Sequence, residues 1–435
     1  MLLKKIFSAL TVLTLLCALA VGFAAPAAAY TLPEDVRLNA RAAAVVFLGG
    51  SAEEDAFIYE KDADAVHAPA ALVRLMAGAY TLKQVKEKGL DMNTVGGTYT
   101  LDLFNTYVAG TGVTAAGMEF GEQWSLRDLL TVSMIQTASD AAITLAATVS
   151  GSVEEFVAGM NALATEIGCE KTHFANVTGL DSLSQYTTVR DLYRILRYAM
   201  QYPEFAEICS QVQYNVQPLS GGRGYTIVNR LDMLRASSTF RYTPLKYGRT
   251  GLSEHEGWGL ASVASDSGYD YLVIVLGCPT KGENGQVGLH YLDTMALFRW
   301  AFRNFTYKTL LADSEILSSV TVRHVWGRQS VNLVPAKAFS TVVPNTVEAG
   351  TVIKKVTLTQ TELTAPIEKG TVCGKVELIV NVDEKIGEVE LVTAEGMQKN
   401  ALLAALSGIG SVFTSLWFWL IFCVLLALII GYVSL

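Results

Sequence analysis

The chain carries a long uncharged segment near its C-terminus, and no other feature limits its possible architecture as strongly. No charged residue follows Lys399, and residues 412–433 are almost entirely apolar. These 22 residues, at about 1.5 Å each, would form a helix roughly 33 Å long, enough to cross the hydrocarbon core of a bilayer. Trp417, Trp419 and Tyr432 would then lie near the membrane surfaces. We therefore predict a transmembrane helix over 412–433, with a buried core helix as the alternative.

Residues 1–29 read as a secretory signal peptide. Lys4 and Lys5 precede an apolar run that extends to about Phe23, and small residues fill positions 24–29, where cleavage is expected. An uncleaved anchor is the alternative. With a single C-terminal span, such a leader predicts a cell-membrane protein whose bulk is extracytoplasmic.

Charge and cysteine usage exclude several classes of protein. The net charge of −8 becomes −10 (−8 − 2) when the two leader lysines are removed, and no basic cluster is present, so we predict no nucleic-acid partner. The histidines show no metal-ligand spacing, and we predict no metal or other cofactor. The cysteines outside the apolar ends are widely spaced and favour isolated core thiols, although one disulfide stays open: Cys169, Cys209, Cys278 and Cys373.

Between the leader and residue 306 the patterns mix strands and helices. Residues 43–49 and 56–60 predict a hairpin, and residues 258–264 and 271–277 predict a second strand pair. An amphipathic helix is expected from Ala70, because apolar residues follow at helical spacing. Further expectations are strands in the Gly-rich stretch 98–124, a helical cluster over roughly 125–205 and a closing helix over 289–305.

The composition changes from about residue 316. Short β-branched, alternating runs separated by turns predict a small all-β domain over 312–396. The best strand candidates are 320–325, 330–335, 352–358, 375–380 and 388–392.

Three short segments in the first part of the chain stand out by their order. The first is residues 69–76 (Pro-Ala-Ala-Leu-Val-Arg-Leu-Met) at a helix start, the second is 137–142 (Thr-Ala-Ser-Asp-Ala-Ala) at a helix junction, and the third is 249–251 (Arg-Thr-Gly) before a strand pair. Residues three apart on a helix share a face and can exchange a proton, which is how one group of enzymes activates a serine. Together, and in this order, the segments resemble the motifs of the penicillin-recognising serine acyltransferases.

Within that group the chain resembles the D-alanyl-D-alanine carboxypeptidases, which are low-molecular-mass penicillin-binding proteins, over about residues 34–396. Further segments carry the resemblance: 121–130, 156–161, 172–181, 186–188 and 365–370. Class A β-lactamases resemble the chain only in the motifs. The resemblance implies an α+β penicillin-binding/β-lactamase-like domain over 34–306, with an antiparallel sheet, flanking helices and a helical subdomain. It also implies that the all-β domain holds this domain away from the membrane.

The first two motifs are substituted. Ala71 stands where the family has its serine nucleophile, and Arg74 stands where it has its lysine base. Thr137 occupies the position of the serine in the second motif, and Ser139 that of its asparagine. Thr137 keeps a hydroxyl, whereas Ser139 loses the amide that would hold a substrate carbonyl.

The third motif departs less from the pattern of the family than the first two do. Arg249 replaces the lysine of Lys-Thr-Gly and retains a cation for a substrate carboxylate, while Thr250 and Gly251 match. By the same resemblance, the backbone N–H groups of Ala71 and Leu252 form the oxyanion hole, which requires no particular side chain.

These substitutions argue against the reaction of the family. Ala71 has no nucleophilic atom, and an arginine with a pKa above about 12 is a poor general base. Loss of such a nucleophile typically costs on the order of 10⁶ in rate. We predict an inactive homologue, with a surface or salt-bridged role for Arg74 as an alternative to a role in the site.

Three functions remain in competition. The leading hypothesis is an inactive homologue that binds peptidoglycan stem peptides ending in D-Ala-D-Ala, or an envelope protein, through Thr137, Ser139, Arg249 and Thr250. The second is an active carboxypeptidase that uses Thr137 as a displaced nucleophile, with Lys246 as the nearest alternative base. The third is a structural envelope protein whose cleft has no ligand.

Overall fold

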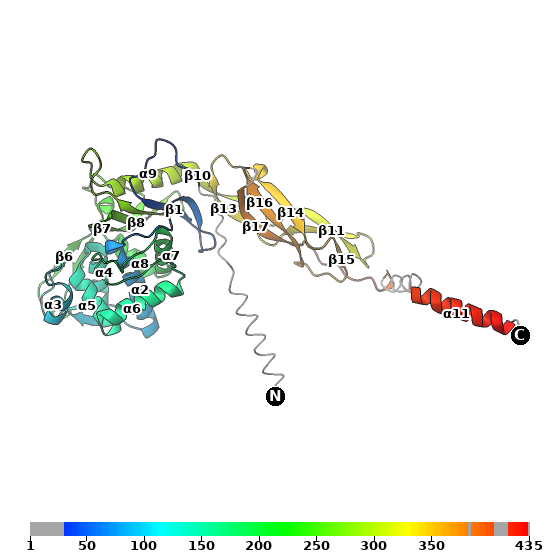
Figure 1. Ribbon diagram of the computed structural model, residues 1–435, viewed down its shortest axis with the longest axis horizontal. Coiled ribbons are helices and arrows are strands. Elements are labelled where there is room, and N and C mark those ends of the chain that lie inside the picture. Colours follow the sequence, from blue (N-terminus) through cyan, green and yellow to red (C-terminus); the bar gives the residue numbers. More distant parts are fainter. Residues whose placement is uncertain (1–29, 382–383, 404–415, 434–435) are drawn as a thin grey trace, which may run out of the picture. The chain divides into compact units, whose positions relative to one another are not determined.

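The computed structural model describes residues 30–381, 384–403 and 416–433, so the leader expected over 1–29 lies outside the described residues. The described chain forms two compact units, one ending at Phe305 and the other starting at Thr306 (Figure 1). The first unit contains helices and a sheet, and the second is built from strands.

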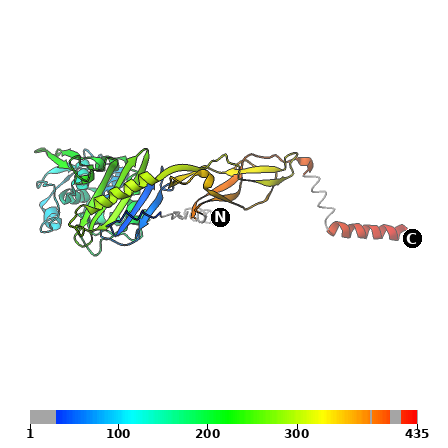
Figure 2. The same ribbon diagram turned by 90° about the horizontal axis from the view of Figure 1, so that it is seen from above.

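An antiparallel five-stranded sheet forms the centre of the first unit. Its strands, in spatial order, are β2 (Ala56–Lys61), β1 (Ala42–Leu48), β9 (Tyr269–Cys278), β8 (Gly257–Asp266) and β7 (Leu245–Ser253). Helix α9 (Leu289–Asn304) covers one face of this sheet (Figure 2). The other face packs against helices, which is why strands such as β9 read as continuous apolar runs rather than alternating ones. Both predicted strand pairs and the closing helix are confirmed.

The helical layer is organised around α2 (Val73–Lys88), which contacts each of the larger helices of the layer. Ser125, Ser152 and Thr188 begin three of these helices, each accepting a hydrogen bond from the backbone N–H three residues later. The neighbours of α2 are α4 (Leu126–Gln136), α5 (Ser139–Ser150), α6 (Val153–Glu166), α7 (Val189–Ala199) and α8 (Pro203–Ser210). The predicted helical cluster is confirmed.

Two local expectations need correction. The stretch 98–124 is not strand throughout: short strands at its ends, β3 (Gly96–Thr98) and β4 (Gln123–Ser125), flank helix α3 (Leu101–Tyr107). This helix begins because the Thr100 hydroxyl accepts a hydrogen bond from the Leu103 N–H. The helix expected from Ala70 starts as a 3-10 turn, η1 (Ala70–Leu72), before α2. The remaining elements of the unit are β5 (Gln213–Val216), β6 (Tyr225–Val228) and η2 (Asp232–Leu234).

The second unit begins with an all-β domain, as predicted. A two-stranded sheet pairs β10 (Phe305–Leu311) with β13 (Phe339–Pro344), and η3 (Ala349–Thr351) follows it. The larger sheet has the order β14 (Ile353–Leu358), β16 (Val372–Val380), β17 (Glu384–Thr393), β12 (Ser330–Pro335), β11 (Ser318–Arg323) and β15 (Glu362–Thr364), with β11 and β15 parallel. Alternating residues of these strands fill one apolar core.

The C-terminal helix is α11 (Leu416–Val433). Among the described residues, no single helix is long and apolar enough to cross a membrane; Phe418–Ile430 is a shorter apolar helix, and α5 with α6 passes such a test only as a pair bent by 81°.

The five cysteines among the described residues are unpaired, and Cys423 in α11 is one of them. Cys209, Cys278 and Cys373 are buried, and Cys169 is half-buried. Burial raises the pKa of the Cys169 and Cys209 thiols to about 12. Thiols with such values are almost fully protonated near neutral pH and react poorly.

His290 on α9 is expected to make stability depend on pH. Its ring stacks on Trp258 with centroids 4.6 Å apart, and neither ring nitrogen has a hydrogen-bond partner in the part of the chain that the structure describes. Burial lowers its pKa from 6.5 to about 4. The unfolded chain therefore binds this proton at a higher pH than the folded chain. The contribution of neutral His290 is complete above about pH 6.5 and is lost as the pH falls toward 4, by about 3 kcal/mol in all.

The variant His290→Phe keeps a stacked ring and removes the titration. In chemical denaturation at pH 7 and pH 4.5, we expect the stability of the wild type to fall more than that of the variant. An equal fall in both proteins would contradict the assignment.

Candidate functional site

Strand β7 and turn η1 lie in close contact at Ala71. A Cβ atom added to Gly251 would lie 2.9 Å from the Ala71 backbone nitrogen and 3.0 Å from the Pro69 carbonyl oxygen. Because real Cβ contacts are essentially never that short, only glycine allows the strand to lie so close. Ala71 itself is half-buried. The predicted first and third segments are therefore in direct contact.

A loop that includes Gly179 packs against the same turn. A Cβ atom on Gly179 would lie 2.7 Å from the Ala70 carbonyl oxygen and 2.8 Å from the Ala71 Cα atom, and its φ of +85° also favours glycine. The Asn176 side chain shapes the loop by accepting a hydrogen bond from the Gly179 N–H at 2.8 Å and donating one to the Leu180 carbonyl at 3.0 Å. The loop thus forms a third wall beside Ala71.

Arg74 connects this loop to the second motif. Its side chain is fully buried, and Nη1 donates to the carbonyl oxygens of Ser133 (3.2 Å) and Ala138 (2.5 Å) and to the Ser133 hydroxyl (3.3 Å). Nη2 donates to the Ser139 hydroxyl (3.0 Å) and the Thr178 carbonyl oxygen (3.2 Å). No carboxylate pairs with the guanidinium within the described chain, so the alternative of a surface or salt-bridged arginine is wrong.

The protonation of Arg74 differs from the sequence-based expectation. Burial, together with the neighbouring Arg249, lowers the pKa of Arg74 well below its usual value, and Asp140 opposes the change. The argument against a general base therefore rests on geometry. Both terminal nitrogens donate to fixed oxygens, and Ala71 offers no hydroxyl proton to remove.

The second motif lies at the junction of α4 and α5. Thr137 ends α4 with a φ of +65°, and Ala70 in η1 has a φ of +45°. Positive φ is unfavourable for residues with a side chain, so two strained residues lie at this site. Ser139 begins α5, and its hydroxyl accepts from Arg74 while its N–H donates to the Thr114 carbonyl oxygen at 2.7 Å.

Arg249 of β7 is a buried cation of a different kind. Its side chain makes no hydrogen bond or ion pair among the described residues, and both Nε and Nη2 are buried without an acceptor. Burial lowers its pKa to about 10, and Arg230 adds to the shift. Next to it, Thr250 is half-buried, and Leu252 exposes 44% of its surface. The site therefore holds two neighbouring buried guanidinium groups.

Polar contacts join the turn between β7 and β8 to the Gly179 loop and to the segment before η1. The residues that make these contacts were not predicted to belong to the site. The Asp181 carboxylate accepts from the Ser253 hydroxyl at 2.7 Å and the Glu254 N–H at 2.9 Å. Glu256 contacts His67 Nδ1 at 2.6 Å. His67 lies two residues before Pro69, and Asp181 lies two residues after Gly179. This closeness in sequence was the one indication that they belong to the site.

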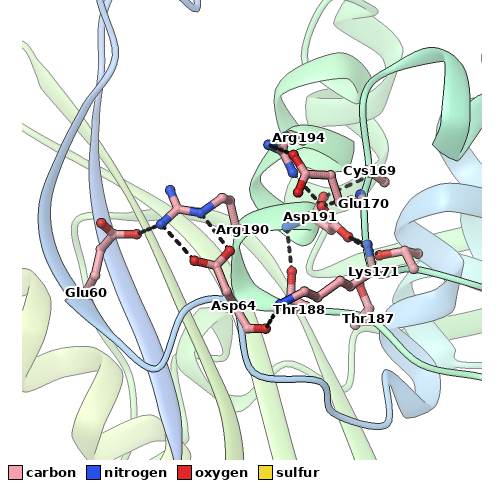
Figure 3. A network of polar contacts seen from close by, with 11 residues as sticks. Glu60, Asp64, Cys169, Glu170, Lys171, Thr187, Thr188, Arg190, Asp191 and Arg194 are labelled. Atoms are coloured by element: carbon pink, nitrogen blue, oxygen red, sulfur yellow. Dashed lines mark hydrogen bonds and ion pairs between the residues drawn. The ribbon is translucent and has the colours of Figure 1, made fainter. Parts of the chain in front are cut away.

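A polar network that includes Asp191 and Thr187 (Figure 3) is connected to His67, in the segment that leads into η1. His67 and Thr187 exchange backbone hydrogen bonds, and the Thr187 hydroxyl lies 3.0 Å from that of Thr172. Thr172 in turn donates to buried Asp191, which also accepts from the Lys171 N–H at 2.8 Å. This explains why the segments 172–181 and 186–188 accompany the motifs.

Lys246, the alternative base, lies near the opposite end of β7 from the Arg249–Leu252 part of the strand. It lines a cavity of about 480 Å³ together with Leu48, Met200, Tyr247 and Asp270, among others. Neither Ala71 nor Thr137 lines that cavity.

Comparison with known proteins agrees with this geometry. Residues 33–280 match the D-alanyl-D-alanine carboxypeptidase family, and residues 305–399 match the C-terminal domain of penicillin-binding protein 5. The chain belongs to the D-alanyl-D-alanine carboxypeptidase family.

Individual relatives cover most of the chain. The D-alanyl-D-alanine carboxypeptidase DacC of Escherichia coli is 29% identical over 348 residues, covering 78% of this chain and 80% of DacC. DacA of Haemophilus influenzae is 28% identical over 368 residues, covering 82% and 83%. The crystal structure of penicillin-binding protein 5 from Haemophilus influenzae superimposes with a TM-score of 0.66 at 22% identity, covering 85% of this chain and all of that one.

The structure brings most of the predicted site residues together. Gly251 contacts Ala71, Arg74 bonds to Ser139 and to the residue that follows Thr137, and Arg249 is close enough to affect the pKa of Arg74. The roles assigned to these residues, to Thr250 and to the Leu252 N–H stay predictions.

Proposed function

We propose that this chain is an inactive D-alanyl-D-alanine carboxypeptidase homologue that binds, and does not cleave, peptidoglycan stem peptides. The proposal includes a leader over 1–29, a peptide-binding domain over 34–306, an all-β domain over 312–396 and a membrane anchor over 412–433. An envelope protein that presents a similar free C-terminus is the other ligand of the same site.

One observation carries the proposal of inactivity. The serine position holds Ala71, and the lysine position holds a guanidinium whose Nη1 and Nη2 donate to oxygens of Ser133, Ala138, Ser139 and Thr178. Acyl transfer needs a nucleophile and a nearby group that accepts its proton. Ala71 cannot supply the nucleophile. The N–H groups of Arg74 are already used in hydrogen bonds to the segments that surround the site.

Arg249 supports retention of a ligand. A buried cation without acceptors is costly for a folded protein, and an anion that enters the site would offset this cost. The C-terminal carboxylate of a stem peptide is such an anion. The half-buried Thr250 and the exposed Leu252 lie beside Arg249 on the same strand, where they can meet the rest of the peptide.

Two measurements on the full chain test the proposal. A fluorescent penicillin should give no covalent adduct, as judged by gel fluorescence and intact mass. Calorimetry should detect a pentapeptide ending in D-Ala-D-Ala, and the same peptide with an amidated C-terminus should bind much more weakly. A covalent adduct would refute the inactivity, and equal behaviour of the two peptides would refute carboxylate recognition.

Replacing Arg249 is expected to increase stability while weakening binding. Arg249→Met removes a desolvated cation with unpaired N–H groups, so we expect a gain of about 1–3 kcal/mol in the free energy of unfolding. Affinity for the pentapeptide should fall about 10- to 100-fold, since a charge-assisted hydrogen bond is lost. Arg241→Met, at an exposed arginine, is the matched control and should change neither quantity. A destabilised Arg249→Met would show that the cation has a structural role.

The displaced-nucleophile hypothesis has less support. The Thr137 hydroxyl makes no hydrogen bond among the described residues, and Thr137 does not line the cavity that Lys246 lines. Release of D-alanine from the pentapeptide, abolished by Thr137→Ala, would favour it nonetheless. Failure of every peptide to bind would favour the third hypothesis, a structural envelope protein.

A further inference from the structure

The all-β domain presents one large aromatic side chain to solvent. Trp326 exposes 75% of its surface, whereas Trp124 and Trp300 in the first unit are buried. It lies in residues 324–329, between β11 and β12, which we call the Trp326 turn. A tryptophan side chain that is exposed to water is unfavourable unless something covers it, because a large apolar area stays in water.

The backbone of the Trp326 turn is held in place. His324 and Gly327 on either side have φ values of +64° and +87°, and Val325 is buried in the core of the domain. The buried Val325 fixes the turn to the core. The side chain of Trp326 therefore projects from an anchored loop.

The turn adjoins the segment that leads toward the apolar C-terminus. The Asn400 N–H donates to the His324 carbonyl oxygen at 2.7 Å, and Met397 pairs with Ile367 on the neighbouring strand segment. Leu402, two residues after Asn400, exposes 64% of its surface. Two exposed apolar side chains thus belong to the end of the domain from which the chain continues to α11.

The length of the connection limits how far this end can be from α11. Thirteen peptide steps join Leu403 to Leu416, so the two ends are at most about 45 Å apart even when the chain is fully extended. Residues 404–415 carry no charge, and α11 exposes apolar residues such as Trp419 and Leu428. If α11 enters a bilayer, the Trp326 turn is tethered close to its surface.

Two lysines at this end of the domain can face an anionic surface, next to the exposed Glu368 and to Glu395, which is paired with Arg328. Lys369 and Lys399 are exposed and have no ion-pair partner among the described residues. A Cβ atom on Gly396 would lie 3.4 Å from the Lys369 backbone nitrogen, so both lysines belong to the end that carries Trp326 and Leu402. Exposed lysines near a bilayer are attracted to anionic headgroups.

We propose that the Trp326 turn is a membrane-contact site that inserts Trp326 into the interface of an anionic bilayer, with Lys369 and Lys399 over the headgroups. Tryptophan prefers this interface because its ring is apolar and its N–H finds polar partners there. The proposal rests on the proposed C-terminal anchor. It adds a second contact, which would restrict how the all-β domain can rotate above the membrane.

Quenching of tryptophan fluorescence by brominated lipids tests this contact. The full chain is reconstituted in phosphatidylcholine vesicles containing phosphatidylglycerol, with either brominated or ordinary acyl chains, and flotation confirms attachment. Trp326→Phe keeps an apolar ring and removes the fluorophore. Three of the six tryptophans, Trp326, Trp417 and Trp419, would be accessible to bromine. The quenched intensity of the variant should therefore be about a third lower than that of the wild type.

The outcomes distinguish failure of the membrane contact alone from failure of the membrane anchor. A lower quenched intensity for Trp326→Phe supports the contact, and a smaller effect in Lys369→Glu/Lys399→Glu would support its dependence on anionic lipid. Flotation with identical quenching in wild type and Trp326→Phe overturns the contact and leaves the anchor standing. Absence of flotation overturns both.

Discussion

The variant that combines Ala71→Ser with Arg74→Lys is expected to form a covalent adduct with penicillin. It regains a nucleophile and a shorter cation at the positions where the family has them. Burial and the neighbouring Arg249 lower the pKa of Arg74, and the same environment would lower the pKa of a lysine from a smaller starting value. A lysine with a lowered pKa is a better acceptor of the serine proton than an arginine.

The expected change is large, since loss of a serine nucleophile costs on the order of 10⁶ in rate. Time-resolved labelling with a fluorescent penicillin, confirmed by intact mass, measures it. The single variants are the matched controls: Ala71→Ser has a nucleophile without a suitable base, and Arg74→Lys has no nucleophile. A folded double variant that is never acylated would show that β7 or the Gly179 loop no longer holds the new serine and the penicillin in a reactive arrangement.

Arg74→Met is expected to destabilise the first unit by about 3–5 kcal/mol. The substitution keeps much of the buried volume but leaves oxygens of Ser133, Ala138, Ser139 and Thr178 without their donor. Buried acceptors that lose a charged partner carry costs of this size in sum. For a unit of this length the midpoint of thermal unfolding should fall by about 10 °C.

Arg127→Met is the matched control for this experiment. Arg127 on α4 is partly exposed, bonds to Asn93 and lies 3.4 Å from Glu207. Surface pairs of this kind contribute about 1 kcal/mol or less. Equal losses in Arg74→Met and Arg127→Met would mean that the hydrogen bonds of Arg74 do not hold the site together.

The two buried arginines are therefore expected to respond in opposite directions. Among the described residues, Arg74 and Arg249 are both buried without a carboxylate partner, yet Arg74 has five acceptor contacts and Arg249 has none. Loss of Arg74 should destabilise the fold, and loss of Arg249 should stabilise it. The comparison separates a structural cation from one that awaits a ligand.

These arginines also show what the sequence could and could not predict. The order of the motifs predicted that Ala71 and Arg74 lie near Thr137, Ser139 and Arg249, because those positions are marked by side-chain type. Three of the five acceptors of Arg74 are backbone carbonyl oxygens, and a carbonyl belongs to every residue type. No sequence pattern could identify them.

The same distinction explains the other surprises. The place of Gly251 in the site was expected from its motif. The close packing of Gly179 became visible only when the structure placed its loop against η1. Helix α3 escaped prediction because glycines on both sides of Leu101–Tyr107 suggested turns between strands. The hairpin β1–β2 and the all-β domain were predictable, since alternation and β-branching act locally.

The hydrogen bonds of Arg74 have an evolutionary consequence. A return to lysine at this position alone would sacrifice contacts that now join α4, α5 and the Gly179 loop, and it would restore no activity while Ala71 remains. A return to serine at position 71 alone would restore a hydroxyl without a base. Neither first step brings a benefit, and the first carries a loss of stability. If the chain is inactive, as proposed, the hydrogen bonds of Arg74 would make recovery of catalysis by single substitutions difficult.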